Sequence, residues 1–301
     1  MILAPWPPLF PSPAKFNGKF RKPLFQSPNV VLDSFISHSK YSARSSFKCS
    51  CTKKGNPDNV FERFSVLGSD IPWDSGSVWS TMALYFFSLH IPLSFGGLSV
   101  VAQSLHQPVL DPQTEAISLL VIQTTELLGA LLLLKNTAKS QYKLVNFFQA
   151  NNGSKERNWV QASALGFGFL ILFVFLTSIL ADRLFDPKDV NNPILKEILS
   201  SGSISVTACF LVYCFVTPLL EEIVYRGFLL ASLASTTKWY QAVIISSTIF
   251  SAAHFSGENS LQLFIIGCVF GCSYCWTGNL SSSIAIHSLY NAVTLMVTIL
   301  S

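Results

Sequence analysis

Charged side chains are scarce in this sequence. Only 12% of its 301 residues are Asp, Glu, Lys or Arg and 50% are hydrophobic, whereas a soluble domain carries about 25% charged residues. The net charge of +4 comes largely from the first 54 residues and forms no basic stripe on a folded segment, which argues against a nucleic-acid partner. The shortage of charge therefore favours a polytopic membrane protein.

Several common site signatures are also missing. The sequence has no His-Glu-x-x-His zinc motif and no glycine-rich phosphate loop after a strand. Its seven cysteines form no disulfide framework, because most of them lie inside apolar runs. Cys268, Cys272 and Cys275 share one helix face at i, i+4, i+7 spacing. We interpret them as polarizable packing residues, with a metal or cluster site as the alternative.

Residues 1–50 have the composition of an organelle transit peptide. The first 54 residues contain nine Lys or Arg and a single acid, Asp33, with serines clustered between residues 34 and 46. No uninterrupted apolar run of a secretory signal is present. Arginine is sparse and the start is rich in proline, so we predict a chloroplast rather than a mitochondrion. A disordered cytosolic tail is the alternative reading.

Apolar stretches dominate the chain after a polar linker at 51–77. A membrane span requires about 20 apolar residues, and this length predicts an all-α, polytopic membrane helix bundle of about seven or eight helices over 78–301. We place seven of them near residues 78–102, 114–134, 159–181, 203–232, 239–255, 261–276 and 280–300. The fifth and sixth are short, so we expect them to be tilted or sheltered inside the bundle.

Loop charges predict the orientation of these helices. The loop 135–158 holds five Lys or Arg, whereas the loop 103–113 holds none. The positive-inside rule then places the mature N-terminus and the loop 135–158 on the same side of the membrane. In a chloroplast this side would be the stroma.

The stretch TPLLEEIVYRGFLL, residues 217–230, places two glutamates and an arginine in apolar surroundings. Each charge at such depth costs about 2.5–3.5 kcal/mol on insertion scales. Glu222 and Arg226 have the i, i+4 spacing of an ion pair, which would fix the helix register. Glu221 points about 100° away from Glu222, so it is free to act as a general base. A purely structural pair is the alternative, but it leaves Glu221 unexplained.

Two further segments carry polar groups at membrane depth. IFSAAHF places His254 four residues after Phe250, and SSSIAIHSLYNAV places His287 and Asn291 on one helix face. Polar groups inside a bilayer associate with one another, so we expect one shared cavity. A glutamate and a histidine can deprotonate a water, and a histidine with an amide can stabilise the resulting oxyanion. This set can hydrolyse a peptide bond without a covalent intermediate.

The motifs EEIVYR, FSAAH and HSLYN, within residues 217–291, resemble the EExxxR, FxxxH and HxxxN motifs of the CPBP family. This family comprises the CAAX-type (type II) intramembrane endopeptidases and bacteriocin-processing relatives. The resemblance implies that the first glutamate and the FxxxH histidine activate the water, while the HxxxN pair forms the oxyanion hole. It implies the catalytic residues Glu221, His254, His287 and Asn291. It implies supporting roles for Glu222, Arg226 and Phe250.

The same residues leave the question of a metal open. Two histidines and a carboxylate could hold Zn²⁺ with a free fourth position, but no close His-x-x-x-His pair is present and the fourth group is an amide. We therefore predict glutamate-protease chemistry without a cofactor, with zinc as the alternative. The absence of an inverted repeat argues against a transporter.

The sequence thus predicts an intramembrane endopeptidase of a chloroplast membrane, either envelope or thylakoid. Its substrate would be a membrane protein or a lipidated peptide in the lipid bilayer. The alternative function is a non-catalytic membrane scaffold that regulates the stability of chloroplast membrane proteins.

Overall fold

The computed structural model describes residues 64–68, 71–139, 147–148, 157–184, 193–257 and 259–300. All regular elements in these ranges are helical, which confirms the predicted all-α class. The transit peptide predicted at 1–50 lies outside the described residues, as does the first part of the predicted linker.

The helices follow one another as expected from the apolar runs. The α-helices are α1 (Val78–Tyr85), α2 (Gly97–Ser104), α3 (Pro112–Thr137), α4 (Trp159–Leu184), α5 (Pro193–Ser200), α6 (Ser203–Leu211), α7 (Thr217–Glu222), α8 (Ala231–Ala234), α9 (Trp239–Ala253), α10 (Ser260–Thr277) and α11 (Leu280–Leu300). Short helical segments join α1 to α2 and α6 to α8, so that two long continuous rods result. Six segments of the described chain are long and apolar enough to cross a membrane: Ser75–Ser104, Pro112–Thr137, Trp159–Ile179, Ser203–Ala234, Ser260–Thr277 and Leu280–Leu300.

The fifth predicted span, 239–255, forms α9 and is too short to cross a bilayer unaided. Its 15 residues extend over about 22 Å at 1.5 Å per residue, whereas the hydrocarbon core is about 30 Å thick. The helix packs against α10 and against the segment that follows α7. One face of α9 is therefore buried against these neighbours, whereas Ile244 on another face is 50% exposed.

Both long rods contain π-helical segments next to a proline. The first rod includes η2 (Phe86–His90) and η3 (Pro92–Gly96), and the second includes η6 (Val212–Val216) and η7 (Ile223–Leu230) on either side of α7. A proline inside a helix lacks the N–H donor and clashes with the carbonyl four residues earlier. The wider turns at Pro92 and before Pro218 accommodate this clash.

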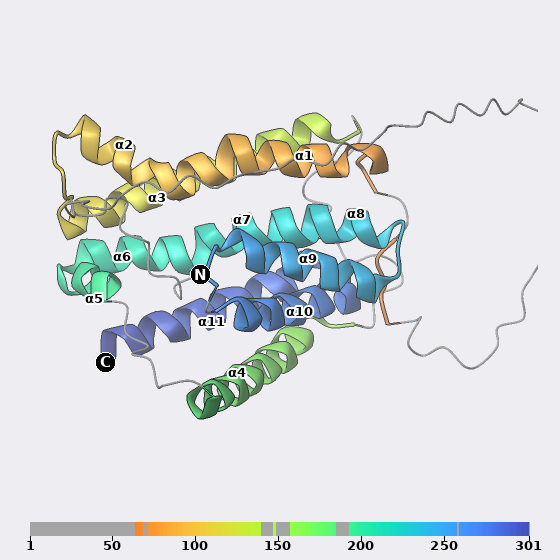
Figure 1. The fold of residues 1–301 in the computed structure, drawn as a ribbon. Coiled ribbons are helices and arrows are strands. Elements are labelled where there is room, and N and C mark those ends of the chain that lie inside the picture. The colour runs from red at the N-terminus through yellow and green to blue at the C-terminus, as the bar shows by residue number, and fades with distance from the viewer. Residues whose placement is uncertain are drawn as a thin grey trace, which may run out of the picture. The chain divides into compact units, whose positions relative to one another are not determined.

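Figure 1 shows how the helices are layered. The rod from α6 to α8 lies between α1–α3 on one side and α9–α11 on the other, and α4 covers the outside of α10 and α11. The largest hydrophobic core joins side chains of α1, α3, η7, α9 and α10. The motif-bearing helices therefore lie at the centre of the bundle, with other helices on both sides.

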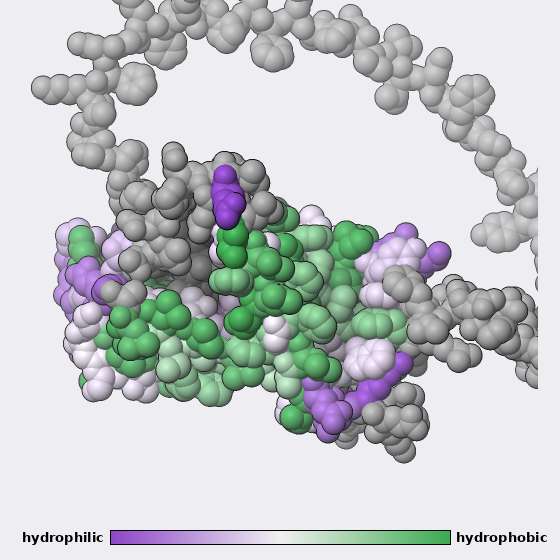
Figure 2. Space-filling view, turned by 90° about the horizontal axis from the view of Figure 1, so that it is seen from below, coloured by the Kyte–Doolittle hydropathy of each residue, from purple (hydrophilic) through white to green (hydrophobic). Residues whose placement is uncertain are grey.

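The outer surface of α4 is apolar, as a lipid-facing helix requires. Its exposed side chains include Leu165, Phe169, Leu172, Phe175 and Leu176. Figure 2 shows hydrophobic side chains over the middle of this face of the molecule and hydrophilic ones toward its ends. Soluble monomeric proteins rarely expose a contiguous apolar surface of this kind. The pattern therefore agrees with a multi-pass membrane protein.

The chain before α1 and the start of the loop after α3 lie at the same end of the bundle. The backbone N–H of Lys139 donates to the carbonyl of Pro72 at 2.8 Å. The Lys139 ammonium also donates to the carbonyl of Ile71 at 3.2 Å. The segment before α1 and the loop 135–158, which the positive-inside rule assigns to one side of the membrane, thus begin next to each other.

Two glycines allow α10 to approach the helices behind it. A Cβ atom on Gly267 would lie 3.0 Å from the Cβ of Ser247 and 3.2 Å from its Cα, and one on Gly271 would lie 3.2 Å from Val243. Small residues four positions apart are typical of close helix contacts in membranes. The three cysteines of α10 pack against the main core, which supports a packing role.

We predict that Gly267→Leu destabilises the protein, because the new side chain meets the backbone of α9 rather than a movable side chain. Overpacking of this kind costs about 1–3 kcal/mol. The measurement is the thermal unfolding midpoint of the detergent-purified protein. Gly168→Leu is the matched control, because a Cβ at Gly168 meets nothing within 4 Å. Equal midpoints for the two variants would contradict the proposed close packing.

Candidate active site

A buried ionic network joins three helices at the centre of the bundle. One oxygen of Glu222, Oε1, accepts a hydrogen bond from Nη1 of Arg226 at 3.0 Å and one from Nδ1 of His287 at 3.0 Å. The second terminal nitrogen of Arg226 donates to the carbonyl of Gly267 at 3.2 Å. The side chains of Glu222, Arg226 and His287 are fully buried. The i, i+4 ion pair predicted from the sequence is therefore present.

Aromatic rings surround the buried guanidinium of Arg226. Its central carbon lies 4.3 Å from the ring centroid of Phe250 and 5.2 Å from that of Phe270. A desolvated cation over an aromatic face gains about 2 kcal/mol, which offsets part of the cost of burial. The same Phe250 ring lies 4.7 Å from the His254 ring. Phe250 therefore contacts both the ion pair and the second-motif histidine.

Glu221 points away from this ion pair and lies between two histidines. Its Oε1 is 3.7 Å from Nε2 of His254, and its Oε2 is 3.7 Å from Nε2 of His287. These separations are too long for direct hydrogen bonds. The side chains of Glu221 and His254 retain 10% and 11% of their exposure, in contrast to Glu222. The prediction that the adjacent carboxylates face different surroundings is correct, although His287 contacts both.

Hydrogen bonds define how the two rings are protonated. A carbonyl oxygen can only accept, so Nδ1 of His254 donates to the carbonyl of Phe250, at 2.7 Å. The Nε2 atom of a neutral His254 then directs its lone pair toward Glu221. His287 donates through Nδ1 to Glu222, and its Nε2 has no hydrogen-bond partner among the described residues.

Both carboxylates of this cluster lie beside basic groups. Arg226 pairs with Glu222 at 3.0 Å, and the Nε2 atoms of His254 and His287 both face Glu221. Buried charges are tolerated when they are paired, so the cluster can remain at this depth.

Asn291 lies one turn after His287 and is held by the backbone of η6. Its Nδ2 donates to the carbonyl of Tyr213 at 2.8 Å. In this π-helical segment the N–H of Thr217 donates to the carbonyl five residues earlier. The corresponding donor for Tyr213 would come from Pro218, which has no N–H. Asn291 thus satisfies a carbonyl that the proline leaves without a donor.

The structure brings the predicted catalytic residues together to different degrees. Glu221 lies 3.7 Å from both His254 and His287, whereas Asn291 is connected to them through α11 and donates a hydrogen bond to Tyr213. Its Oδ1 is buried and accepts no hydrogen bond from the part of the chain that is described. One N–H of the amide is not needed for the Tyr213 carbonyl, because an amide nitrogen carries two hydrogens.

The side chains form no ready-made metal site within the described ranges, where no group of three or more His, Cys, Asp or Glu residues is placed to hold a metal ion. Nδ1 of each motif histidine is bonded, to Phe250 in one case and to Glu222 in the other, and the Nε2 atoms face Glu221. Bonds of this kind orient a histidine in metal sites as well as in metal-free ones.

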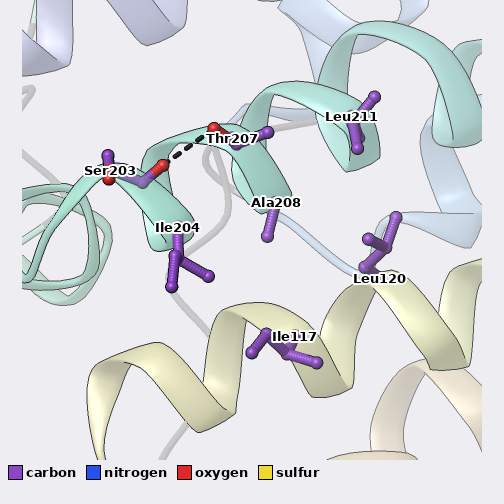
Figure 3. A pocket seen from close by; sticks show the side chains of 7 residues that line it. All are labelled: Ile117, Leu120, Ser203, Ile204, Thr207, Ala208 and Leu211. Carbon is purple, nitrogen blue, oxygen red and sulfur yellow. Dashed lines mark hydrogen bonds between the residues drawn. The ribbon is translucent and has the colours of Figure 1, made fainter.

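A separate groove of about 300 Å³ lies between α3 and α6. Figure 3 shows Ile117 and Leu120 on one side and the side chains of α6 on the other. The lining is almost entirely apolar and includes none of the motif residues. Its position among exposed α3 and α6 residues agrees with a lipid-facing furrow, and the chemistry lies elsewhere.

A second group of buried polar residues, not predicted from the sequence, surrounds Glu126. Glu126 is fully buried and contacts Tyr85, His90 and Ser94 from the first rod. The signal was available, because a glutamate in the middle of an apolar span is as unusual as the pair at 221–222. Glu126 belongs to none of the three motifs.

Comparison with known protein families agrees with this geometry. Residues 203–293 match the family described as type II CAAX prenyl endopeptidase Rce1-like. The chain matches no characterised protein and no solved structure. The matched segment includes every residue of the three motifs, whereas Glu126 and its contacts lie outside it. Residues 203–293 are therefore similar to the domain of the Rce1-like type II CAAX prenyl endopeptidases, a family of hydrolases.

Proposed function

We propose that the protein is an intramembrane endopeptidase in which Glu221 and His254 activate a water for attack on a peptide bond. The observation that carries this proposal is the position of Glu221. This buried carboxylate lies 3.7 Å from each of two histidine Nε2 atoms, within a domain of a peptidase family. A structural ion pair would require Glu222 and Arg226 alone and gives no reason to retain Glu221.

The attacking water would be held between Glu221 and His254. Both groups present acceptors to it, the carboxylate Oε1 and the Nε2 lone pair of a ring whose Nδ1–H is bonded to Phe250. A water has two hydrogens and can donate one to each acceptor, which directs its oxygen lone pair outward. Glu221 would take the proton as the oxygen attacks the carbonyl carbon.

His287 would stabilise the oxyanion that forms. As an imidazolium it has an Nε2–H donor, since Nδ1–H is bonded to Glu222. A preorganised donor in a site that excludes water is worth about 2.7–4 kcal/mol in the transition state. The second amide hydrogen of Asn291 would add to this donor. Collapse of the intermediate would then transfer the proton from Glu221 to the departing amine.

The substrate class follows from the family and from the location of the site. CAAX endopeptidases act on prenylated proteins, and the six candidate spans place the residues within a membrane bundle. We propose a membrane-associated or lipidated peptide as the substrate. A farnesylated peptide with three residues after its modified cysteine is therefore a suitable first probe.

We predict that Glu221→Gln abolishes hydrolysis while the protein folds normally, because the amide keeps the shape but cannot accept the proton. General-base catalysis contributes about 10²–10⁴-fold, so kcat should fall by at least about 100-fold. The measurement uses purified protein in liposomes with the farnesylated probe and, in cells, the N-terminal peptides of membrane proteins.

Glu197→Gln is the matched control, because Glu197 is exposed on α5. Unchanged cleavage by the Glu221→Gln variant would refute the proposed mechanism. Rescue of a loss-of-function strain by Glu221→Gln, with no wild-type-dependent cleavage, would favour the non-catalytic scaffold.

We propose that Glu222 and Arg226 support the site by holding His287, and we predict strong coupling between them. Arg226→Met leaves a buried carboxylate without its strongest partner, which typically costs about 3–5 kcal/mol. Glu222→Gln in the same chain removes the uncompensated charge. The double variant should therefore be more stable than the sum of the two single effects predicts. Additive losses of unfolding free energy, measured in lipid nanodiscs, would contradict the coupling.

We propose a chloroplast membrane as the location and residues 1–50 as the targeting segment, on the basis of their basic, serine-rich composition. Residues 1–60 fused to a fluorescent protein should accumulate in chloroplasts and be shortened on import. A truncated protein that lacks residues 1–50 should fail to enter chloroplasts. Delivery of the fusion to mitochondria or to the endoplasmic reticulum would show that this assignment is wrong.

A further inference from the structure

The buried cluster around Glu126 provides the carboxylate with three donors. Glu126 Oε1 accepts from the Tyr85 hydroxyl at 2.8 Å and contacts Nδ1 of His90 at 2.8 Å, and Oε2 accepts from the Ser94 hydroxyl at 3.1 Å. Tyr85, His90 and Ser94 belong to the first rod, whereas Glu126 lies in α3. None of these residues is in the segment 203–293 that matches the peptidase family.

Hydrogen bonding favours an ion pair between His90 and Glu126. Nε2 of His90 is 3.3 Å from the carbonyl of Ala253, which can only accept, so this nitrogen carries a proton. Nδ1 faces a carboxylate that already receives two hydroxyl donors. A proton on Nδ1 gives an imidazolium with both N–H groups bonded, and within the described chain His90 is the basic side chain paired with Glu126.

This imidazolium lies at the C-terminus of α9. The last carbonyls of a helix have no partner within the helix, and a positive charge there interacts favourably with the helix dipole. In α9 the carbonyls of residues 250–252 accept from groups of His254 and Phe255, and that of Ala253 accepts from His90. His90 thus completes the cap of α9 from a different helix.

The first rod also contacts the residue that follows His254. Phe255 has a positive φ of 49°, which is unfavourable for a bulky residue and requires support from its surroundings. The Phe95 ring of η3 packs edge-on against the Phe255 ring, with centroids 5.0 Å apart. Two residues of the first rod, His90 and Phe95, therefore hold the two neighbours of His254.

We propose that His90, charged through its pair with Glu126, is a positioning residue for His254. The contact with Ala253 fixes the end of α9, and the Nδ1 bond of His254 to Phe250 directs Nε2 toward Glu221 within that fixed turn. The first rod and α3 are thus part of the catalytic apparatus, although they lie outside the family domain. This inference rests on the proposed peptidase function for its kinetic consequences but not for its structural ones.

The first test is spectroscopic and needs no substrate. Solid-state NMR of ¹⁵N-histidine-labelled protein in lipid should show His90 with both ring nitrogens protonated and His254 as a neutral ring protonated at Nδ1. Glu126→Gln should remove the His90 imidazolium signal and shift the His254 resonances. A neutral His90 in the wild type, or unchanged His254 resonances in Glu126→Gln, would overturn the proposal.

The second test is kinetic and uses the farnesylated probe. His90→Asn should lower kcat by about 10-fold or more with KM changed less than about twofold, because a misplaced catalytic group slows chemistry. Glu126→Gln should act in the same direction, and the double variant should be no slower than the slower single one. His106→Asn is the matched control, since His106 is exposed in the turn after α2.

The outcomes separate the two proposals. Wild-type kcat in His90→Asn would overturn the positioning role while leaving the peptidase function intact. An inactive wild type would refute the peptidase function, and the NMR result would still decide whether His90 holds His254. If His90→Asn unfolds, Glu126→Gln, which keeps the side-chain volume, provides the same comparison.

Discussion

The two hydrogen bonds accepted by one carboxylate oxygen of Glu222 organise the centre of this protein. They join the rod 203–234 to itself through Arg226 and to α11 through His287. Charged side chains at this depth are tolerated only when they are paired. The helices that carry their partners must therefore be packed together before any of these charges is stable. Gly267 takes part in this network, because its carbonyl accepts a hydrogen bond from Nη2 of Arg226.

Adjacent carboxylates serve different purposes because a helix separates them by about 100°. Glu222 is fully buried and accepts two hydrogen bonds through Oε1, whereas Glu221 lies at the edge of the network and retains some exposure. His287 connects the two through its opposite ring nitrogens. The His287 ring therefore lies between the Glu222–Arg226 ion pair and Glu221, the residue proposed to accept a proton.

Much of this arrangement could be predicted from the sequence, because the relevant interactions are local. Helix positions follow from apolar run lengths, and the Glu222–Arg226 pair follows from i, i+4 spacing. Helix α9 ends at Ala253, two residues before the predicted end, and Phe255 beyond it has a positive φ of 49°. The Asn291 contact could not be predicted, since it depends on a π-helical segment and on the donor that Pro218 lacks. Glu126 and His90 were missed because 36 and 163 residues separate His90 from its partners.

The wide turns of η6 and η7 constrain the number of residues in the second rod as well as their identity. A π-helical turn accommodates one more residue than an α-helical turn, so it amounts to a single inserted residue. Removal of one residue from η6 would restore ordinary winding and leave α6 in nearly the same rotation relative to Glu221, whereas removal of one residue from an α-helical turn of the rod would rotate α6 by about 100°. The face of α6 that packs on α3 and the acidic pair could then not both keep their partners. A deletion of one residue within Val212–Val216 should therefore be absorbed more readily than one elsewhere in the rod, and alignments of related helices must allow a gap there to keep their faces in register.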